Sequence, residues 1–299
     1  MLFFSESESN GVGVSLLNVS NAVVENTTIV NERIGILTQN SVNCTFTKNK
    51  VRVVTESAFN LVESRSCDTI GNSVYNAKIG YELSYLSNCR LNWNNATQIS
   101  SIGITLTDCV DCEVLHNIAT ITGAIGLSIL NSNILDIGFN TAYLSDGAGF
   151  ELSNLHSCML FNNTSVLNDG TGFWLDDSSS CTILFNNGVQ NGASGMSTQR
   201  LRNNTLSNNI LCTNGINGLE LFSTLSASML FNNSFGWNTR NNAYDDSTAS
   251  IWLGNKWSDY EGLGEYNIPG WTNANDTNPS LLVDTSRHLW ARRIDGGQR

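Results

Sequence analysis

Acidic and aromatic side chains gather in one stretch of the sequence where they could contact a sugar. Glu151 is followed 23 positions later by Trp174, and Asp176 and Asp177 lie two and three positions beyond Trp174. An indole can stack on a sugar ring, and carboxylates accept hydrogen bonds from hydroxyl groups. Glycosidases use two carboxylates roughly 5–10 Å apart. We therefore predict a shallow saccharide site at these four residues, without assigning a catalytic residue. The alternative is that the acids only solvate an exposed face.

Two further aspartates could share a cation. Asp146 and Asp169 lie 23 positions apart, and each precedes a glycine. Calcium takes six to eight oxygen ligands, so two acids do not make a site. We expect no cofactor, with calcium the one ion that this pair suggests.

The three histidines show no triad and no metal-ligand spacing. They are His116, His156 and His288. His116 shares its position in the sequence pattern with Trp93 and Phe139, which favours packing over catalysis.

Six of the eight cysteines recur at one position of a repeat: Cys44, Cys67, Cys89, Cys112, Cys158 and Cys181. A disulfide staple and a row of metal ligands are the alternatives to simple packing. Stacked cysteines have Cβ atoms about 4.8 Å apart, beyond the usual 3.5–4.5 Å of a disulfide. We predict a column of buried free thiols. Cys109 and Cys112 form a C-x-x-C with no second pair, which does not define a zinc or redox site.

A repeat of 22 or 23 residues must position all these side chains. It is marked by nine asparagines: Asn49, Asn72, Asn94, Asn117, Asn140, Asn163, Asn186, Asn209 and Asn232. Fourteen residues before each lies a glycine or, once, an alanine, followed by apolar residues at alternate positions, as in Phe150 and Leu152. Alternation of this kind is typical of a strand with one buried face.

The repeat predicts a parallel β-solenoid. Residues 11–254 contain no proline, which suits a continuous sheet, and a helical period of 3.6 is absent. Equivalent asparagines in stacked coils can form an amide ladder, and asparagine tolerates the left-handed backbone of tight turns.

The sequence after residue 240 resembles that of one known family. The matching motifs are N-N-A-Y-D at Asn241–Asp245, G-N-x-W-S-D-Y at Gly254–Tyr260 and Y-x-I-P-G at Tyr266–Gly270. With the preceding repeats, they look like the NosD-type right-handed parallel β-helix family, which is related in architecture to pectin lyases. The resemblance implies an all-β, single-stranded right-handed parallel β-helix of about ten coils with a C-terminal aromatic cap.

The aromatic residues of this ending are expected to cover the last coil, with a sugar-binding patch as the alternative. They are Trp252, Trp257, Tyr260, Tyr266 and Trp271. Related sequences often carry an acidic insertion before the Y-x-I-P-G motif, which here is reduced to residues 261–265, so we expect no calcium site there.

Four parts follow from these patterns. Residues 1–10 form an N-terminal segment that we interpret as truncated, 11–254 the β-helix, 255–283 the cap and 284–299 a flexible tail. The net charge is −11 with only four lysines, which argues against nucleic acid as a partner. No apolar run is long enough to span a membrane.

The interpretation that these features favour is a non-catalytic extracellular or cell-surface β-helix that binds carbohydrate or is structural. Its partner would be a polysaccharide or cell-surface glycan. One alternative is a polysaccharide-active enzyme (a lyase, hydrolase or epimerase) acting on the outer sheet face. The other, implied by the resemblance, is an accessory protein for copper delivery.

Overall fold

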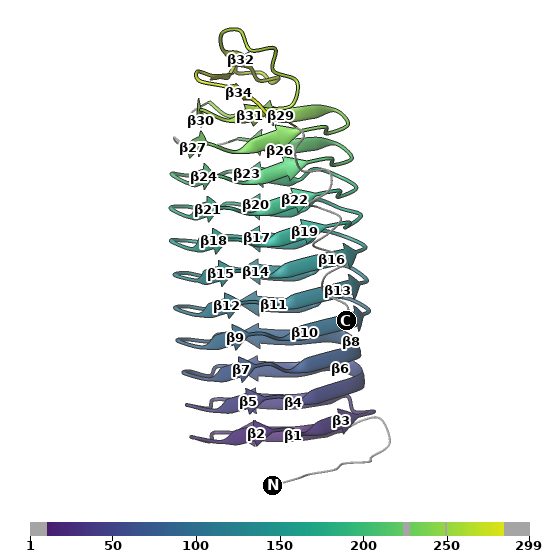
Figure 1. Cartoon of the computed structure of the whole chain (residues 1–299). Helices are drawn as coiled ribbons and strands as arrows, with labels where there is room; N and C mark the ends of the chain where they lie inside the picture. The colour runs from purple at the N-terminus through teal and green to yellow at the C-terminus, as the bar shows by residue number, and fades with distance from the viewer. Residues whose placement is uncertain (1–10, 224–227, 249, 284–299) are drawn as a thin grey trace.

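The chain winds into a rod of stacked coils, without a helix among the residues that are described (Figure 1). The computed structural model describes residues 11–223, 228–248 and 250–283 of the 299-residue chain. The predicted all-β right-handed parallel β-helix is confirmed. The predicted truncated segment 1–10 and flexible tail 284–299 lie outside the described residues, and the division into four parts stays a prediction.

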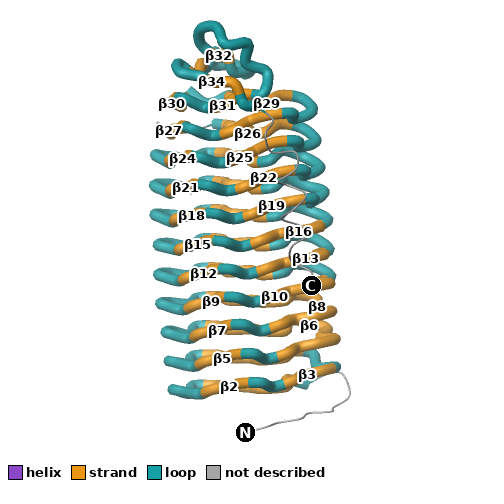
Figure 2. The backbone as a smooth tube through the Cα atoms, viewed as in Figure 1, coloured by secondary structure: helices purple, strands orange, loops and turns teal. Residues whose placement is uncertain are grey.

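Successive coils place their strands at the same positions, so that the strands align in columns (Figure 2). Among the described residues, the larger sheet has 21 strands: β1 (Val12–Leu17), β3 (Thr28–Val30), β4 (Ile34–Gln39), β6 (Lys50–Val62), β8 (Ser73–Ser84), β10 (Asn95–Ile99), β11 (Ile104–Thr107), β13 (Ile118–Thr122), β14 (Leu127–Leu130), β16 (Thr141–Ser145), β17 (Phe150–Ser153), β19 (Thr164–Val166), β20 (Phe173–Asp176), β22 (Asn187–Val189), β23 (Met196–Gln199), β25 (Ile210–Cys212), β26 (Asn217–Phe222), β28 (Ser234–Gly236), β29 (Asn241–Asp245), β31 (Lys256–Trp257) and β34 (Ser280–Leu281).

The smaller sheet, in the part of the chain that the structure describes, has 13 strands: β2 (Val23–Glu25), β5 (Thr45–Thr47), β7 (Asp68–Ile70), β9 (Arg90–Asn92), β12 (Glu113–Leu115), β15 (Asp136–Gly138), β18 (Met159–Phe161), β21 (Thr182–Leu184), β24 (Thr205–Ser207), β27 (Ser228–Phe231), β30 (Ser250–Leu253), β32 (Tyr266–Asn267) and β33 (Asn275–Asp276).

The apolar rows of the sequence are the core of the rod. Phe150 of β17 pairs in register with Leu127 of β14 and with Phe173 of β20, and all three side chains are fully buried. The Phe150 and Phe173 rings stack with centroids 4.7 Å apart. Burying an aliphatic or aromatic side chain of this size contributes roughly 1.5–3 kcal/mol, so repetition along the rod builds one continuous core.

Left-handed turns explain why the chain is rich in asparagine. In the coil that begins at Asn131, residues Asn131, Ile134, Phe139 and Leu144 all have φ between 49° and 56°. Most side chains disfavour this region, which asparagine and glycine tolerate. Each coil needs such corners to fold back on itself, and in most coils asparagine, aspartate or serine occupies several of them.

The glycine row is required by a close approach between coils. A Cβ atom on Gly103 would lie 2.6 Å from the carbonyl oxygen of Gly126 and 2.7 Å from the Cβ of Ala119. Neither neighbour is the end of a flexible side chain, so a larger residue would push the coils apart.

The asparagine ladder is present and buried, with one correction at its C-terminal end. The Asn117 side chain donates to Asn140 Oδ1 at 3.0 Å and to the Leu91 carbonyl at 2.6 Å. Beyond Asn209 the acceptor is Asn233, 24 residues on, and the ladder continues to Asn255. The prediction of Asn232 was wrong, because this coil is one residue longer; Asn232 is exposed at the turn with φ 55°.

A second amide ladder runs along the C-terminal half of the rod. It joins Asn168, Asn191, Asn214 and Asn238 through side-chain hydrogen bonds of 3.0–3.2 Å. This ladder was not predicted from the sequence, because it spans only a few coils.

The predicted aromatic cap closes the last coil. Trp252 and Trp257 are buried, and the Trp257 ring stacks on Tyr266 with centroids 4.0 Å apart. Tyr260 packs against the same cluster, whereas Trp271 is 86% exposed and lies outside that cluster. The prediction for Trp271 was therefore wrong, because its backbone lies on the turn beyond the core.

Two buried aspartates tie the cap to the rod. Asp245 accepts from the Trp252 indole N–H at 2.8 Å. Asp276 accepts from the Gly254 and Asn255 backbone N–H groups at 2.8 Å and from the Trp257 indole at 3.0 Å. A Cβ atom on Gly270 would lie 1.8 Å from the Asp245 carbonyl oxygen, so the terminal motif is explained by capping.

Candidate functional site

The predicted saccharide residues lie on the outward face of the larger sheet. Glu151 of β17 pairs in register with Trp174 of β20, and both are half-buried. Their neighbours Phe150, Leu152, Phe173 and Leu175 point into the core. The fold therefore places the carboxylate and the indole beside each other on one surface, as the sequence hypothesis requires.

The two predicted aspartates are occupied by arginines. Asp176, next to Ser153 in register, forms an ion pair with Arg200. Asp177 lies at the turn after β20 and contacts Arg202 at 3.4 Å. Asp176 thus shares the sheet face with Trp174, while Asp177 belongs to its corner. Neither carboxylate stands free for proton transfer.

Small polar residues hold the glutamates of this face in place. Glu151 accepts from the Ser128 hydroxyl at 3.0 Å. Glu220 accepts from Ser194 at 2.8 Å and from the Asn217 amide at 2.7 Å. Fixed carboxylates of this kind present oxygen atoms in defined positions, which suits recognition of hydroxyl groups.

Beside Trp174, two buried polar atoms lack a hydrogen-bond partner among the described residues. Ser197, in register between Trp174 and Glu220, is 1% exposed, and its hydroxyl makes no hydrogen bond to the described residues. The same holds for Asp176 Oδ1. Unpaired buried groups are costly, but both atoms lie beneath the surface, so they do not add to the contact area that the face offers a ligand.

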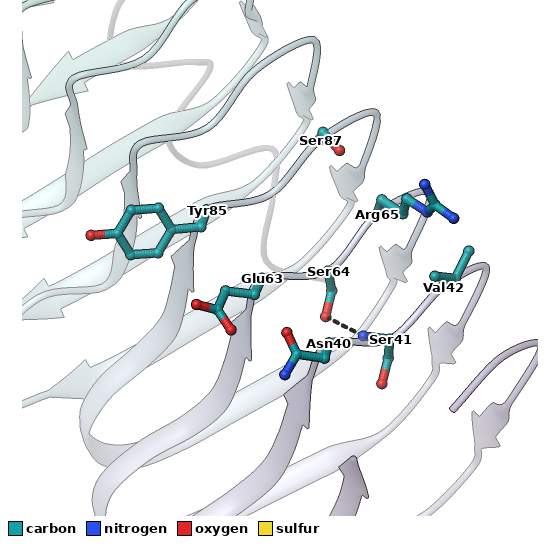
Figure 3. Close-up of a pocket in the computed structure, with 8 residues that line it drawn as sticks. All are labelled: Asn40, Ser41, Val42, Glu63, Ser64, Arg65, Tyr85 and Ser87. Carbon is teal, nitrogen blue, oxygen red and sulfur yellow. Dashed lines mark hydrogen bonds between the residues drawn. The ribbon is translucent and has the colours of Figure 1, made fainter. Parts of the chain in front are cut away.

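A polar depression of about 360 Å³ lies at the turns of three coils (Figure 3). Asn40, Glu63 and Tyr85 line one side of it at equivalent corners, and Arg65 stands on the other side. Ser64 accepts a hydrogen bond from the Ser41 backbone at 3.1 Å across its floor. The sequence analysis did not predict this feature, although the 22- and 23-residue spacing of these corner residues was a signal for it.

The candidate calcium pair has no further ligand. Asp146 and Asp169 are exposed at neighbouring corners. Within the described ranges, no three His, Cys, Asp or Glu residues are grouped so that they could hold a metal ion.

The cysteines are buried and free, as the column predicts. All eight thiols lack a disulfide partner. Cys67 and Cys89 are stacked, with the Cys67 backbone N–H donating to the Cys89 sulfur at 3.3 Å. Hydrogen bonding to neighbouring thiols and burial raise the pKa of Cys89 and of Cys158.

His116 packs in a row of rings, as its pattern indicates. Its imidazole stacks between Trp93 and Phe139, with centroids 3.8 and 4.7 Å away. His156 Nδ1 lies 2.9 Å from the Ser179 hydroxyl. His288 lies outside the described residues.

Stacked parallel coils, a dry core and a capped end define this chain as a β-helix of pectin-lyase-like architecture. The sequence matches the family described as periplasmic copper-binding protein (NosD) over residues 2–141 and 119–262. The chain belongs to the NosD family.

Solved structures share the fold at low identity. The mannuronan C-5 epimerase AlgE4 A-module of Azotobacter vinelandii is similar with a TM-score of 0.66 and 14% identity, over 81% of this chain and 77% of that one. The periplasmic alginate epimerase AlgG gives a TM-score of 0.59 and 14% identity, covering 93% and 80%. Tailspike protein 2 of the Escherichia coli O157:H7 bacteriophage CAB120 gives 0.58 and 8% identity, over 92% and 43%. No curated protein matches. Among the described residues, no helix is long and apolar enough to cross a membrane.

Proposed function

We propose that this chain is a non-catalytic β-helix of the periplasm or the cell exterior that binds polysaccharide along its outward sheet face. The observation that carries the proposal is the pairing of Glu151 with Trp174 on adjacent strands. The indole offers a surface on which a sugar ring can stack, and the fixed carboxylate accepts hydrogen bonds from sugar hydroxyls.

The similar structures support the theme of polysaccharide without defining the activity. Two of them are named as epimerases of mannuronan or alginate. The periplasmic description of the NosD family supports a location outside the cytoplasm. The ion pairs of Asp176 and Asp177 with arginines favour binding over catalysis, because both acids of the predicted site are already engaged.

Copper delivery, the second alternative, finds little support in this chain. Copper(I) binds thiolate, thioether or imidazole groups. The eight thiols are buried, and no three His, Cys, Asp or Glu side chains of the described residues are grouped so that they could hold a metal ion. The described residues thus do not fit a copper site, and we derive no role for the metal here.

The test is a titration of the full chain with alginate, pectin and a neutral glucan by calorimetry. We expect Trp174→Ala to weaken binding about tenfold or more, since stacking on an aromatic ring is worth roughly 1–3 kcal/mol. Trp237→Ala is the matched control, because that indole is also half-buried but lies at the corner after β28 and not in the row of Glu151 and Trp174. Equal binding by both variants would contradict the proposed face.

Catalysis is tested on the same polymers. Prolonged incubation should release no reducing ends and no unsaturated products, and should leave the uronate composition unchanged by NMR. Turnover that is lost in Glu151→Gln would overturn the non-catalytic proposal in favour of an enzyme.

A further inference from the structure

A row of aromatic rings occupies corners where asparagine or glycine would be easier to accommodate. Trp93, His116 and Phe139 follow β9, β12 and β15 (Figure 1) and have φ of 61°, 58° and 56°. Backbone in this region costs roughly 1–2 kcal/mol for ordinary residues. The planes of successive rings differ by only 4° and 5°. Three successive corners with left-handed backbone therefore hold the three rings in one continuous stack.

The stack is closed at one end and open at the other. Phe161 meets Phe139 edge-on, with ring planes at 84°, and lies against Gly138. At the other end, the corner next to Trp93 is Gly71, whose backbone N–H bonds to the Asn92 carbonyl. A Cβ atom on Gly71 would meet nothing within 4 Å. The indole of Trp93 is 63% exposed, so its face toward Gly71 is uncovered.

Because Gly71 has no side chain, a slot about as thick as one aromatic ring is left beside Trp93. The corner beyond Gly71 is Lys48, whose backbone N–H bonds to the Ile70 carbonyl. Coils rise about 4.8 Å each, so Lys48 and Trp93 stand about 10 Å apart. A ring stacked at about the spacing of the existing rings would lie between them. Among the described residues, Lys48 forms one ion pair, a surface contact with Glu25 at 3.4 Å, and such pairs are easily exchanged.

Charge is divided along the rod at this position. Residues 33–90 contain seven Lys or Arg and four Asp or Glu, although the whole chain carries −11. Residues 91–199 contain no Lys or Arg and nine Asp or Glu. The slot therefore opens from Trp93 toward the basic coils, whose field attracts an anion.

From this geometry we infer that Trp93, Gly71 and Lys48 form a second sugar site, which binds the pyranose ring of an acidic, uronate-type saccharide. The sugar's C–H face stacks on the indole, and its carboxylate pairs with the Lys48 ammonium. This site rests on the proposed function only in taking polysaccharide as the class of ligand. It does not require Trp174, and its preferred ligand is an acidic sugar.

The test uses the full chain, an oligogalacturonate and a neutral cello-oligosaccharide of equal length. We expect tighter binding of the acidic probe and a change of tryptophan fluorescence that is absent in Trp93→Phe. Gly71→Trp should extend the stack and block the slot without unfolding, because Trp93 already adopts φ 61° at an equivalent corner. Both Gly71→Trp and Trp93→Ala should weaken binding of the acidic probe about tenfold or more.

Lys48→Met should remove the preference for the acidic probe, whereas Lys256→Met in the last coil is the matched control. Loss of binding in Trp174→Ala, with unchanged binding in Gly71→Trp and Trp93→Ala, would overturn the inference and leave the proposed face. No binding of either probe by the folded wild-type chain would overturn the inference. Loss in Gly71→Trp and Trp93→Ala but not in Trp174→Ala would support this site and contradict the other.

Discussion

Asn117 and Asn140 are joined twice, since both the backbone N–H and the side-chain amide of Asn117 donate to Asn140 Oδ1, at 2.9 and 3.0 Å. The same acceptor role falls to Asn117 for Asn94. Each rung of the ladder therefore supports the rung on either side. This arrangement makes the ladder sensitive to a single substitution.

Asn117→Ala should lower the free energy of unfolding by about 3–5 kcal/mol, because it leaves both Asn94 donors and the Leu91 carbonyl unpaired in the core. Asn154→Ala is the control: that residue is exposed at a corner with φ 52°, and its loss should cost about 1 kcal/mol. Urea denaturation measures both. Similar losses in the two variants would contradict a structural role for the ladder.

Gly103→Ala tests the close approach between coils. The added Cβ atom would meet the Gly126 carbonyl oxygen at 2.6 Å, and we expect destabilisation of about 2–4 kcal/mol. Gly71→Ala adds the same atom in open space at φ 65° and should cost about 1 kcal/mol from the backbone alone. Thermal unfolding should rank them in this order; the reverse order would show that packing is looser than the structure indicates.

Alkaline pH should destabilise the rod through a buried thiol. Burial raises the pKa of Cys109 from 9.0 to about 12. Below pH 9 the thiol is protonated in both states and the stability is complete. As pH rises from about 9 to 12, the unfolded chain releases the proton while the folded chain retains it, so about 4 kcal/mol is lost.

Cys109→Ser isolates this effect. Ser64 and Ser132 occupy equivalent positions and donate to the carbonyl two residues earlier, as Cys109 does. The variant should match the wild type at pH 7 within about 1 kcal/mol and lose less stability above pH 9. Parallel stability curves for the two proteins from pH 7 to 11 would refute the assignment.

Asp276→Ala should loosen the cap. Four donors, from Gly254, Asn255, Trp257 and Asn278, would lose their acceptor, and we expect a loss of about 3 kcal/mol. The bared end strand should also promote association between molecules. Light scattering and denaturation together check this; an unchanged, monodisperse protein would mean that the aromatic stacking closes the rod without Asp276.

The period of the sequence was enough to predict the fold, because every coil repeats the same glycine, apolar and asparagine positions. It failed at Asn232, where one extra residue moves the ladder to Asn233. It failed also at Trp271, because aromatic character alone does not tell a ring that covers the core from one at an exposed turn.

The site was predictable only in part. Alternation places Glu151 and Trp174 outward and in register, and the structure agrees. The arginine partners of Asp176 and Asp177 come from the following coil, at positions that the repeat does not distinguish. The open face of Trp93 depends on a glycine at the preceding corner, and that pairing becomes visible only when corners are compared between coils.

Because each rung of the ladders is satisfied by its neighbours, nothing in the ladder itself limits how many coils the rod can hold. Length is set where Trp257, Tyr266 and Asp276 interrupt the series. A molecule built in this way can be lengthened or shortened by whole turns of about 5 Å, so its length changes in steps of single coils.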